Sequence, residues 1–242
     1  MARGGVLVAL DTTDVAVAKG WARATQGAVA GIKLGLEFFN ARGPAGVAEV
    51  ASLGAPLFLD LKFHDIPNTV AGAVRAVAPL KPMILNLHAS GGAAMMRAAL
   101  DAAREGAARI GAAPPKLIGV TVLTSLSDAD LAEVGQDPHA SDQVRRLAAL
   151  TKACGLDGVV CSPHEIAVLR RDLGPGFLLV TPAVRPAWAA AGDQKRIATP
   201  AAAIHAGADY LVVGRPITAA ADPKDAAEAI HRRAHRGEVD HG

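Results

Sequence analysis

Two of the eight lysines in this 242-residue chain stand at the ends of apolar strand-like segments, Lys33 in AGIKLGL and Lys62 in FLDLKFHD. A lysine is rarely buried without a partner, so each of these needs a carboxylate nearby. Asp60 lies two residues before Lys62, so both side chains point to the same face of a strand. Asp65 follows three residues after Lys62, in the loop that leads to a helix. The spacing predicts a cluster of opposite charges at one end of a strand.

These carboxylates limit the chemistry that Lys62 can perform. Flanking negative charge favours the ammonium form of a lysine. A Schiff-base lysine needs the opposite, a free amine. The sequence therefore predicts that Lys62 is a proton donor and not a covalent nucleophile. The alternative is a salt-bridge network that closes one end of the fold without doing chemistry.

Two further segments have the composition of a phosphate site. Gly214 and Arg215 lie in DYLVVGRPIT, at a turn from the last strand into a helix, where backbone N–H groups bind phosphate. The segment TPAVRPAWAAAGDQKR, residues 181–196, is long for a strand–helix connection and predicts a lid. Its Arg185 could clamp a phosphate with a planar fork of donors, and Gln194 could bond to the same ligand. The alternative is an ordinary surface loop with a solvated arginine.

The elements that must position these residues alternate along the chain. Several apolar runs have no polar face, which is typical of parallel strands covered by helices on one side and core on the other. The expected strands are 6–10, 29–33, 57–62, 83–87, 117–123, 158–160, 177–180 and 210–213. The expected helices are 15–24, 36–52, 69–77, 93–106, 141–153, 163–171, 200–206 and a last one to about 236.

Eight strand–helix units in 242 residues predict one (β/α)8 TIM barrel over residues 1–242. A doubly wound sheet is the rival fold, but the glycines after the first strand do not form its dinucleotide-binding fingerprint. A barrel carries its chemistry at the C-terminal ends of its strands. The polar residues expected at those ends are Asp11, Lys33, Asp60, Lys62, Asn86, His88, Thr124, Ser162, Thr181, Gly214 and Arg215.

Composition excludes several classes of protein. A hydrophobic content of 51% supports a sizeable core and excludes a disordered chain, and a net charge of +2 indicates neither nucleic acid nor an anionic membrane as partner. The longest apolar runs are far shorter than the roughly 20 residues of a membrane helix. The first residues lack the pattern of a secretory signal, and the two cysteines form neither a metal-binding spacing nor a disulfide framework. We therefore expect a cytoplasmic enzyme.

The segment DLKFHDIPNT at 60–69 resembles the DxKxxDIPNT signature of bacterial-type orotidine 5′-phosphate decarboxylases. One departure is mild: TPAVRP carries Ala183 and Val184 where the family pattern has Gly-Ile. The other matching blocks occur in the family's order: LDT at 10–12, IKLG at 32–35, NLHASGG at 86–92, TVLTS at 121–125, TPAVRP at 181–186, GDQKR at 192–196 and VVGRPIT at 212–218.

The resemblance implies a TIM barrel that converts orotidine 5′-phosphate to uridine 5′-phosphate and CO2 in pyrimidine biosynthesis, a carboxy-lyase reaction that needs no metal and no organic cofactor. The counterpart of Lys62 protonates C6 of the pyrimidine, and the counterparts of Asp60 and Lys33 complete an alternating charge network. Asp65 and Thr69 would reach the neighbouring subunit's site, which implies a homodimer.

The resemblance also implies a set of substrate contacts. Asp11 and Lys33 would bind the ribose hydroxyls, Thr124 would bind the pyrimidine edge, and Asp60 would lie near the substrate carboxylate. The phosphate would be held by Arg185, Gln194, Gly214 and Arg215.

The sequence is also compatible with two other functions. One is a Mg²⁺-dependent sugar-phosphate decarboxylase or synthase of the same DxKxxD barrel group. The resemblance to that group implies that its members carry a carboxylate at the position of Lys33. A lysine at that position repels a dication. The other is a catalytically silent, phosphonucleotide-binding barrel that acts as a sensor or scaffold. The presence of Asp60, Lys62 and Asp65 together favours an active enzyme.

Overall fold

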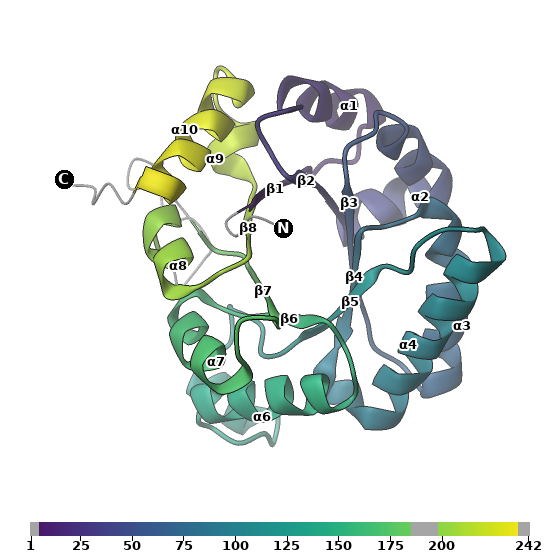
Figure 1. Ribbon diagram of the computed structural model, residues 1–242, viewed down its shortest axis with the longest axis vertical. Coiled ribbons are helices and arrows are strands. Elements are labelled where there is room, and N and C mark those ends of the chain that lie inside the picture. Colours follow the sequence, from purple (N-terminus) through teal and green to yellow (C-terminus); the bar gives the residue numbers. More distant parts are fainter. Residues whose placement is uncertain (1–4, 185–197, 237–242) are drawn as a thin grey trace.

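Short β-branched and leucine-rich segments form strands that pair in chain order and close into a barrel, in which β1 also pairs with β8. The structure, a computed structural model, describes residues 5–184 and 198–236. All of the pairings are parallel, and the helices lie around the outside of the barrel (Figure 1). This confirms the predicted (β/α)8 TIM barrel. The strands are β1 (Gly5–Ala9), β2 (Gly31–Gly35), β3 (Leu57–Phe63), β4 (Ile84–His88), β5 (Lys116–Val120), β6 (Gly158–Val160), β7 (Leu178–Thr181) and β8 (Tyr210–Val213).

The helices follow the strands in sequence. None of the helices in the described ranges is long and apolar enough to cross a membrane. The α-helices are α1 (Val15–Ala24), α2 (Leu36–Ala51), α3 (Pro67–Val77), α4 (Gly92–Arg109), α5 (Asp128–Glu133), α6 (Ala140–Ala153), α7 (Ile166–Leu173), α8 (Pro200–Ala206), α9 (Arg215–Thr218) and α10 (Pro223–Arg236). Three short 3-10 helices are η1 (Ala78–Leu80), η2 (Ala89–Gly91) and η3 (Pro163–Glu165).

Alternation along each strand divides the apolar residues between two cores. Leu57 and Leu59 of β3 pack outward in the large core shared with the helices, whereas Phe58 belongs to a second cluster made only of residues in or next to strands. The second cluster therefore fills the inside of the barrel. Its fully inward members are Leu7, Phe58, Ile84, Ile118, Val180 and Tyr210. Residues two or four positions further along each strand point to the same inner face, nearer the C-terminal ends.

The predicted elements agree with the structure except at a few boundaries. The prediction that the fifth strand continues to residue 123 is wrong, because the chain leaves the sheet after Val120. The expected helix 36–52 is kinked at Gly43, which has a φ of 61°. The next residue, Pro44, has no backbone N–H to donate to the preceding turn. The short helix α5 was not predicted, although its Ser127 and Asp130 form a reciprocal capping box.

A buried ion pair ties the N-terminal ends of β7 and β8 to α7. The Arg170 guanidinium on α7 donates to Asp209 Oδ2 at 2.6 Å and to the carbonyl oxygens of Gly207 and Phe177. Asp209 Oδ2 also accepts the backbone N–H of Leu179 at 2.9 Å. The pair thus satisfies main-chain groups at the end of the barrel opposite the expected chemistry.

We expect Arg170→Ala to lower the free energy of unfolding by about 3–5 kcal/mol, because it leaves Asp209 buried without its guanidinium. Urea unfolding measures this loss. The matched control is Arg171→Ala, which removes the neighbouring arginine, whose side chain is 70% exposed, and should change stability far less. Equal losses in the two variants would show that the buried pair has no special role.

Candidate active site

Four charged side chains of alternating sign lie at the C-terminal ends of the first three strands. Lys33 Nζ on β2 lies 2.7 Å from Asp11 Oδ1, just beyond β1, and 3.8 Å from Asp60 Oδ2 on β3. Lys62 Nζ lies 2.6 Å from Asp60 Oδ1. Asp60 therefore lies between two ammonium groups, and Lys33, Asp60 and Lys62 of the predicted cluster come together within one chain.

Burial makes the charge of Asp60 dependent on these neighbours. Burial by itself raises the pKa of Asp60, but Lys62 and then Lys33 oppose it, and hydrogen bonds from Lys62 and Asn86 add to them. The net effect lowers the pKa of Asp60 below its usual value, so this carboxylate is ionised at neutral pH. The Lys33 side chain is only 9% exposed, which makes it a nearly buried cation held by carboxylates on both sides.

The backbone at Lys62 departs from regular strand geometry. The pairing of β3 with β4 shifts in register between Leu59 and Phe63, and Lys62 has a left-handed φ of 50°. Its main-chain N–H donates to the side-chain oxygen of Asn86 at 2.8 Å. A left-handed conformation is strained for a residue other than glycine, and such strain concentrates at functional sites.

Asn86 is a site residue for which the sequence predicted a position at a strand end but no role. It is fully buried on β4, and its Nδ2 donates to Asp60 Oδ1 at 2.7 Å. The available signal was an amide in the middle of the apolar strand ILNLH, since a buried polar side chain requires partners.

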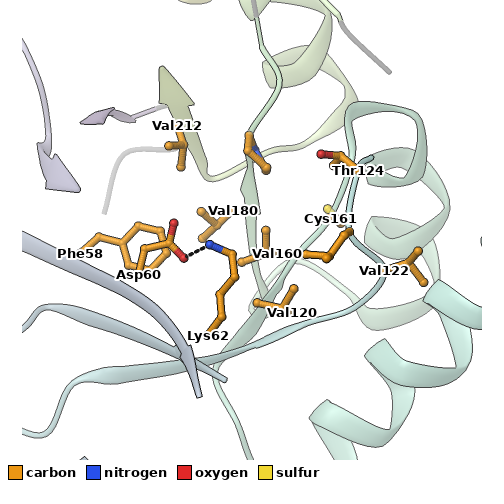
Figure 2. Close-up of a pocket in the computed structure, with 12 residues that line it drawn as sticks. Phe58, Asp60, Lys62, Val120, Val122, Thr124, Val160, Cys161, Val180 and Val212 are labelled. Carbon is orange, nitrogen blue, oxygen red and sulfur yellow. Dashed lines mark hydrogen bonds and ion pairs between the residues drawn. The ribbon is translucent and has the colours of Figure 1, made fainter. Parts of the chain in front are cut away.

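An apolar cavity of about 220 Å³ opens beside Lys62. Figure 2 shows Lys62 reaching into it with its ammonium toward Asp60, and Thr124 on another side of the cavity. Burial raises the pKa of the lining thiol Cys161 to about 12, so this cysteine stays protonated and is no nucleophile. The remaining lining residues are Phe58, Val120, Val122, Leu123, Val160, Val180, Pro182 and Val212.

A more polar cavity of about 230 Å³ adjoins the first, because Asp60, Pro182 and Val212 line both. Gly214 and Arg215 lie on it at the start of α9, as the phosphate prediction requires. Its other lining residues are Ala9, Asp11, Lys33, Ala183, Val184 and Pro216. Ala183 has a left-handed φ of 62°, a conformation that glycine adopts without strain.

Other predicted site residues are not brought to this cluster. Asp65 and Thr69 are exposed at the start of α3, and Asp65 Oδ1 accepts the backbone N–H of Ile66 at 2.6 Å. Arg185 and Gln194, together with most of the expected lid, lie outside the described residues. In the described part of the chain, no group of three or more His, Cys, Asp or Glu side chains is arranged to hold a metal ion.

Two histidines lie beside the charged cluster. His88 ends β4, and its ring centroid is 5.3 Å from that of His64. Burial is the main cause that lowers the pKa of His88, and His64 and Lys62 lower it further while Asp60 opposes them. His88 is therefore neutral at pH 7.

Comparison with known proteins gives one consistent family. The chain matches a family model described as "Orotidine 5'-phosphate decarboxylase / HUMPS family" over residues 5–230. It is 61% identical over 231 residues to an orotidine 5′-phosphate decarboxylase of Rhodospirillum rubrum, covering 95% of this chain and 94% of that protein. A protein of the same name from Paramagnetospirillum magneticum is 56% identical, covering 93% of this chain and 96% of its own length.

A solved structure gives the same result in three dimensions. The crystal structure of orotidine 5′-phosphate decarboxylase from Lactobacillus acidophilus superposes with a TM-score of 0.83 at 38% identity, covering 97% of this chain and all of that one. The sequence blocks, the barrel and the length of the match agree. The chain belongs to the orotidine 5′-phosphate decarboxylase / HUMPS family.

Proposed function

We propose that this protein is a carboxy-lyase that converts orotidine 5′-phosphate to uridine 5′-phosphate and CO2, with Lys62 as the proton donor to C6 of the pyrimidine. The observation that carries the proposal is the position of the Lys62 ammonium. It is held 2.6 Å from Asp60 and lines an apolar cavity that adjoins a polar one. The names of the most similar relatives support the same substrate.

The reaction breaks the bond between C6 and the carboxylate carbon, and the electron pair stays on C6. That pair lies in the plane of the ring, so the π system does not delocalise it. A proton then moves from Lys62 Nζ to C6, CO2 leaves, and the amine takes a new proton from solvent. Stabilisation of the carbanion must be electrostatic, and a preorganised ammonium inside an apolar cavity provides it.

Asp60 adds a smaller effect. Two like charges about 4 Å apart, such as Asp60 and the substrate carboxylate, repel by roughly 4 kcal/mol at an effective dielectric constant near 20. Enzymes lower barriers by about 8–23 kcal/mol, so this repulsion alone is insufficient. We therefore expect electrostatic stabilisation of the carbanion to dominate, with Lys62 as its main source.

The two cavities match the two ends of the nucleotide. The apolar cavity suits the pyrimidine, with Thr124 at its edge, and the polar cavity suits the ribose and phosphate. We assign Asp11 and Lys33 to the ribose hydroxyls, and Gly214 and Arg215 to the phosphate. From the sequence we add Arg185 and Gln194 to the phosphate contacts and retain residues 181–196 as a lid.

We further propose a homodimer in which Asp65 and Thr69 enter the neighbouring subunit's site. Both residues are exposed, and between them Ile66 is 66% exposed. An exposed apolar side chain beside the signature carboxylate is consistent with a surface that a second subunit covers. We expect this cytoplasmic dimer to act in pyrimidine biosynthesis without a metal or organic cofactor.

The alternative is a Mg²⁺-dependent sugar-phosphate decarboxylase or synthase, because the family description covers more than one activity. Lys33 is the observation against it. Its ammonium lies between Asp11 and Asp60, at 2.7 and 3.8 Å, where a divalent cation would meet a like charge. The geometry therefore favours the nucleotide decarboxylase.

We expect Lys62→Ala to lower kcat for orotidine 5′-phosphate by about a thousandfold or more, because the ammonium that stabilises the carbanion is lost. The fall in absorbance of the substrate measures turnover. Lys81→Ala is a matched control, since Lys81 is an exposed lysine with a similar left-handed φ of 49°. Retention of more than about a tenth of kcat would remove Lys62 from the central role.

Wild-type activity should also survive EDTA, whereas loss on chelation would favour the Mg²⁺-dependent alternative.

We expect Arg185→Ala to reduce kcat/KM for orotidine 5′-phosphate far more than for orotidine, the substrate without its phosphate. The reason is that the binding energy of the phosphate helps to stabilise the transition state, and a substrate without the phosphate does not supply that energy. Parallel assays of the two substrates measure the difference. Arg104→Ala changes an arginine whose side chain is 63% exposed on α4 and is the control. Equal losses for both substrates would refute the phosphate assignment.

The dimer assignment predicts complementation between two inactive variants. Lys62→Ala and Asp65→Ala should each be inactive alone. A mixed dimer then holds one complete site, with Lys62 from one subunit and Asp65 from the other. Random mixing by co-refolding should restore about a quarter of the wild-type activity. No recovery, with mixed dimers verified by mass, would place Asp65 in its own subunit's site or outside any site.

A further inference from the structure

We infer that Asn86 is a positioning residue that orients the Lys62 ammonium for proton transfer by holding both the Lys62 backbone and the Asp60 carboxylate. This inference rests on the proposed decarboxylase function. Asn86 does not line either cavity, so its effect must pass through these two neighbours. It is fully buried on β4, directly beside the bulged segment of β3.

Both ends of the Asn86 side chain have a fixed partner. Its Oδ1 accepts the main-chain N–H of Lys62 at 2.8 Å, and its Nδ2 donates to Asp60 Oδ1 at 2.7 Å. The N–H of Lys62 can only donate and the carboxylate of Asp60 can only accept. The orientation of the amide is therefore determined by its partners, and neither a carboxylate nor an apolar side chain could satisfy both.

The bond to Lys62 replaces a missing contact of the sheet. Pairing between β3 and β4 is regular at Leu59 and resumes at Phe63, so Lys62 lies within the interruption. Lys62 combines a left-handed φ of 50° with a main-chain N–H that donates to Asn86 Oδ1. Asn86 thus supports the backbone conformation that brings Lys62 Nζ within 2.6 Å of Asp60.

The bond to Asp60 acts on the charge of the site. Asp60 Oδ1 accepts from Asn86 as well as from Lys62, while Oδ2 faces Lys33. The hydrogen bond from Asn86 contributes to the lowered pKa of Asp60. Loss of Asn86 should raise the pKa of Asp60. In an acid titration, Asp60 of the variant would then take up its proton at a higher pH than Asp60 of the wild type.

The other charged and titratable groups around Asp60 remain in place when Asn86 is replaced. They are Lys33 on β2, Lys62 on β3, His88 on β4, and Asp11 beyond β1, which acts through Lys33. His64 interacts with His88, and in the proposed homodimer Asp65 of the neighbouring subunit would join the set. If Asn86→Leu shifts the acid limb of the pH profile of kcat, that shift therefore reports on the lost hydrogen bond.

The experiment compares Asn86→Leu and Asn86→Asp with the wild type on orotidine 5′-phosphate. Asn86→Leu keeps a similar volume and removes both hydrogen bonds. Asn86→Asp keeps an acceptor for Lys62 but puts a like charge beside Asp60. We expect kcat to fall about a hundredfold in both, as for an ångström-scale misplacement of a catalytic group. KM should change far less, and the acid limb of the kcat profile should move to higher pH.

Thr151→Val is the control for the loss of a buried polar group. Thr151 is fully buried on α6, outside the barrel, and donates to the carbonyl oxygen of Leu147 at 2.7 Å. The substitution Thr151→Val should lower the melting temperature and leave kcat and its pH profile unchanged. If Asn86→Leu does not fold, the isosteric Asn86→Asp carries the test.

Two results would overturn the inference in distinguishable ways. If the wild type turns over the substrate and a folded Asn86 variant keeps more than about half of kcat with an unmoved acid limb, Asn86 has only a structural role. If the wild type does not decarboxylate orotidine 5′-phosphate, the proposed function and this inference both fail.

Discussion

The structure of the site depends on one constraint, the burial of the Asp60 carboxylate between two ammonium groups. An ionised carboxylate out of water is unfavourable unless cations and donors surround it. Lys33, Lys62 and Asn86 meet this need from three adjacent strands. Each of these groups is held in turn by Asp60, so the cluster is stable only when β2, β3 and β4 are in their observed register. The barrel therefore positions these charged side chains, and their interactions in turn constrain the register of its strands.

The same cluster divides the binding region into an apolar half and a polar half. Phe58 and the valines beside Lys62 give one cavity mostly apolar walls, while Asp11, Lys33 and Arg215 line the other. Electrostatic interactions are stronger where water is excluded. Under the proposed function, the cation on the apolar side would act on a developing carbanion, and the polar groups on the other side would bind a ribose and a phosphate.

A stabilising ion pair and the candidate active site lie at opposite ends of the barrel. The buried pair of Arg170 and Asp209 satisfies main-chain groups where β7 and β8 begin. Lys62 and Ala183 have left-handed backbone at the C-terminal ends, beside the cavities, whereas the third such residue, Lys81, precedes β4. The strained backbone beside the cavities persists because well-packed structure around it over-determines its conformation.

The sequence by itself determined the alternation of strands and helices, the polar ends of the strands, and the shared face of Asp60 and Lys62. These follow from local periodicity, which one segment carries alone. Only the tertiary structure decided that Asn86 bonds to both of them, that β3 is bulged at Lys62, and that the fifth strand ends at Val120. Those features depend on the register between segments more than 20 residues apart, for which no local pattern exists. Asp65 is exposed in the single chain, and the proposed homodimer would give it a place in the neighbouring subunit's site. Periodicity specifies which face a side chain occupies, whereas the packing of distant segments specifies which atoms it meets.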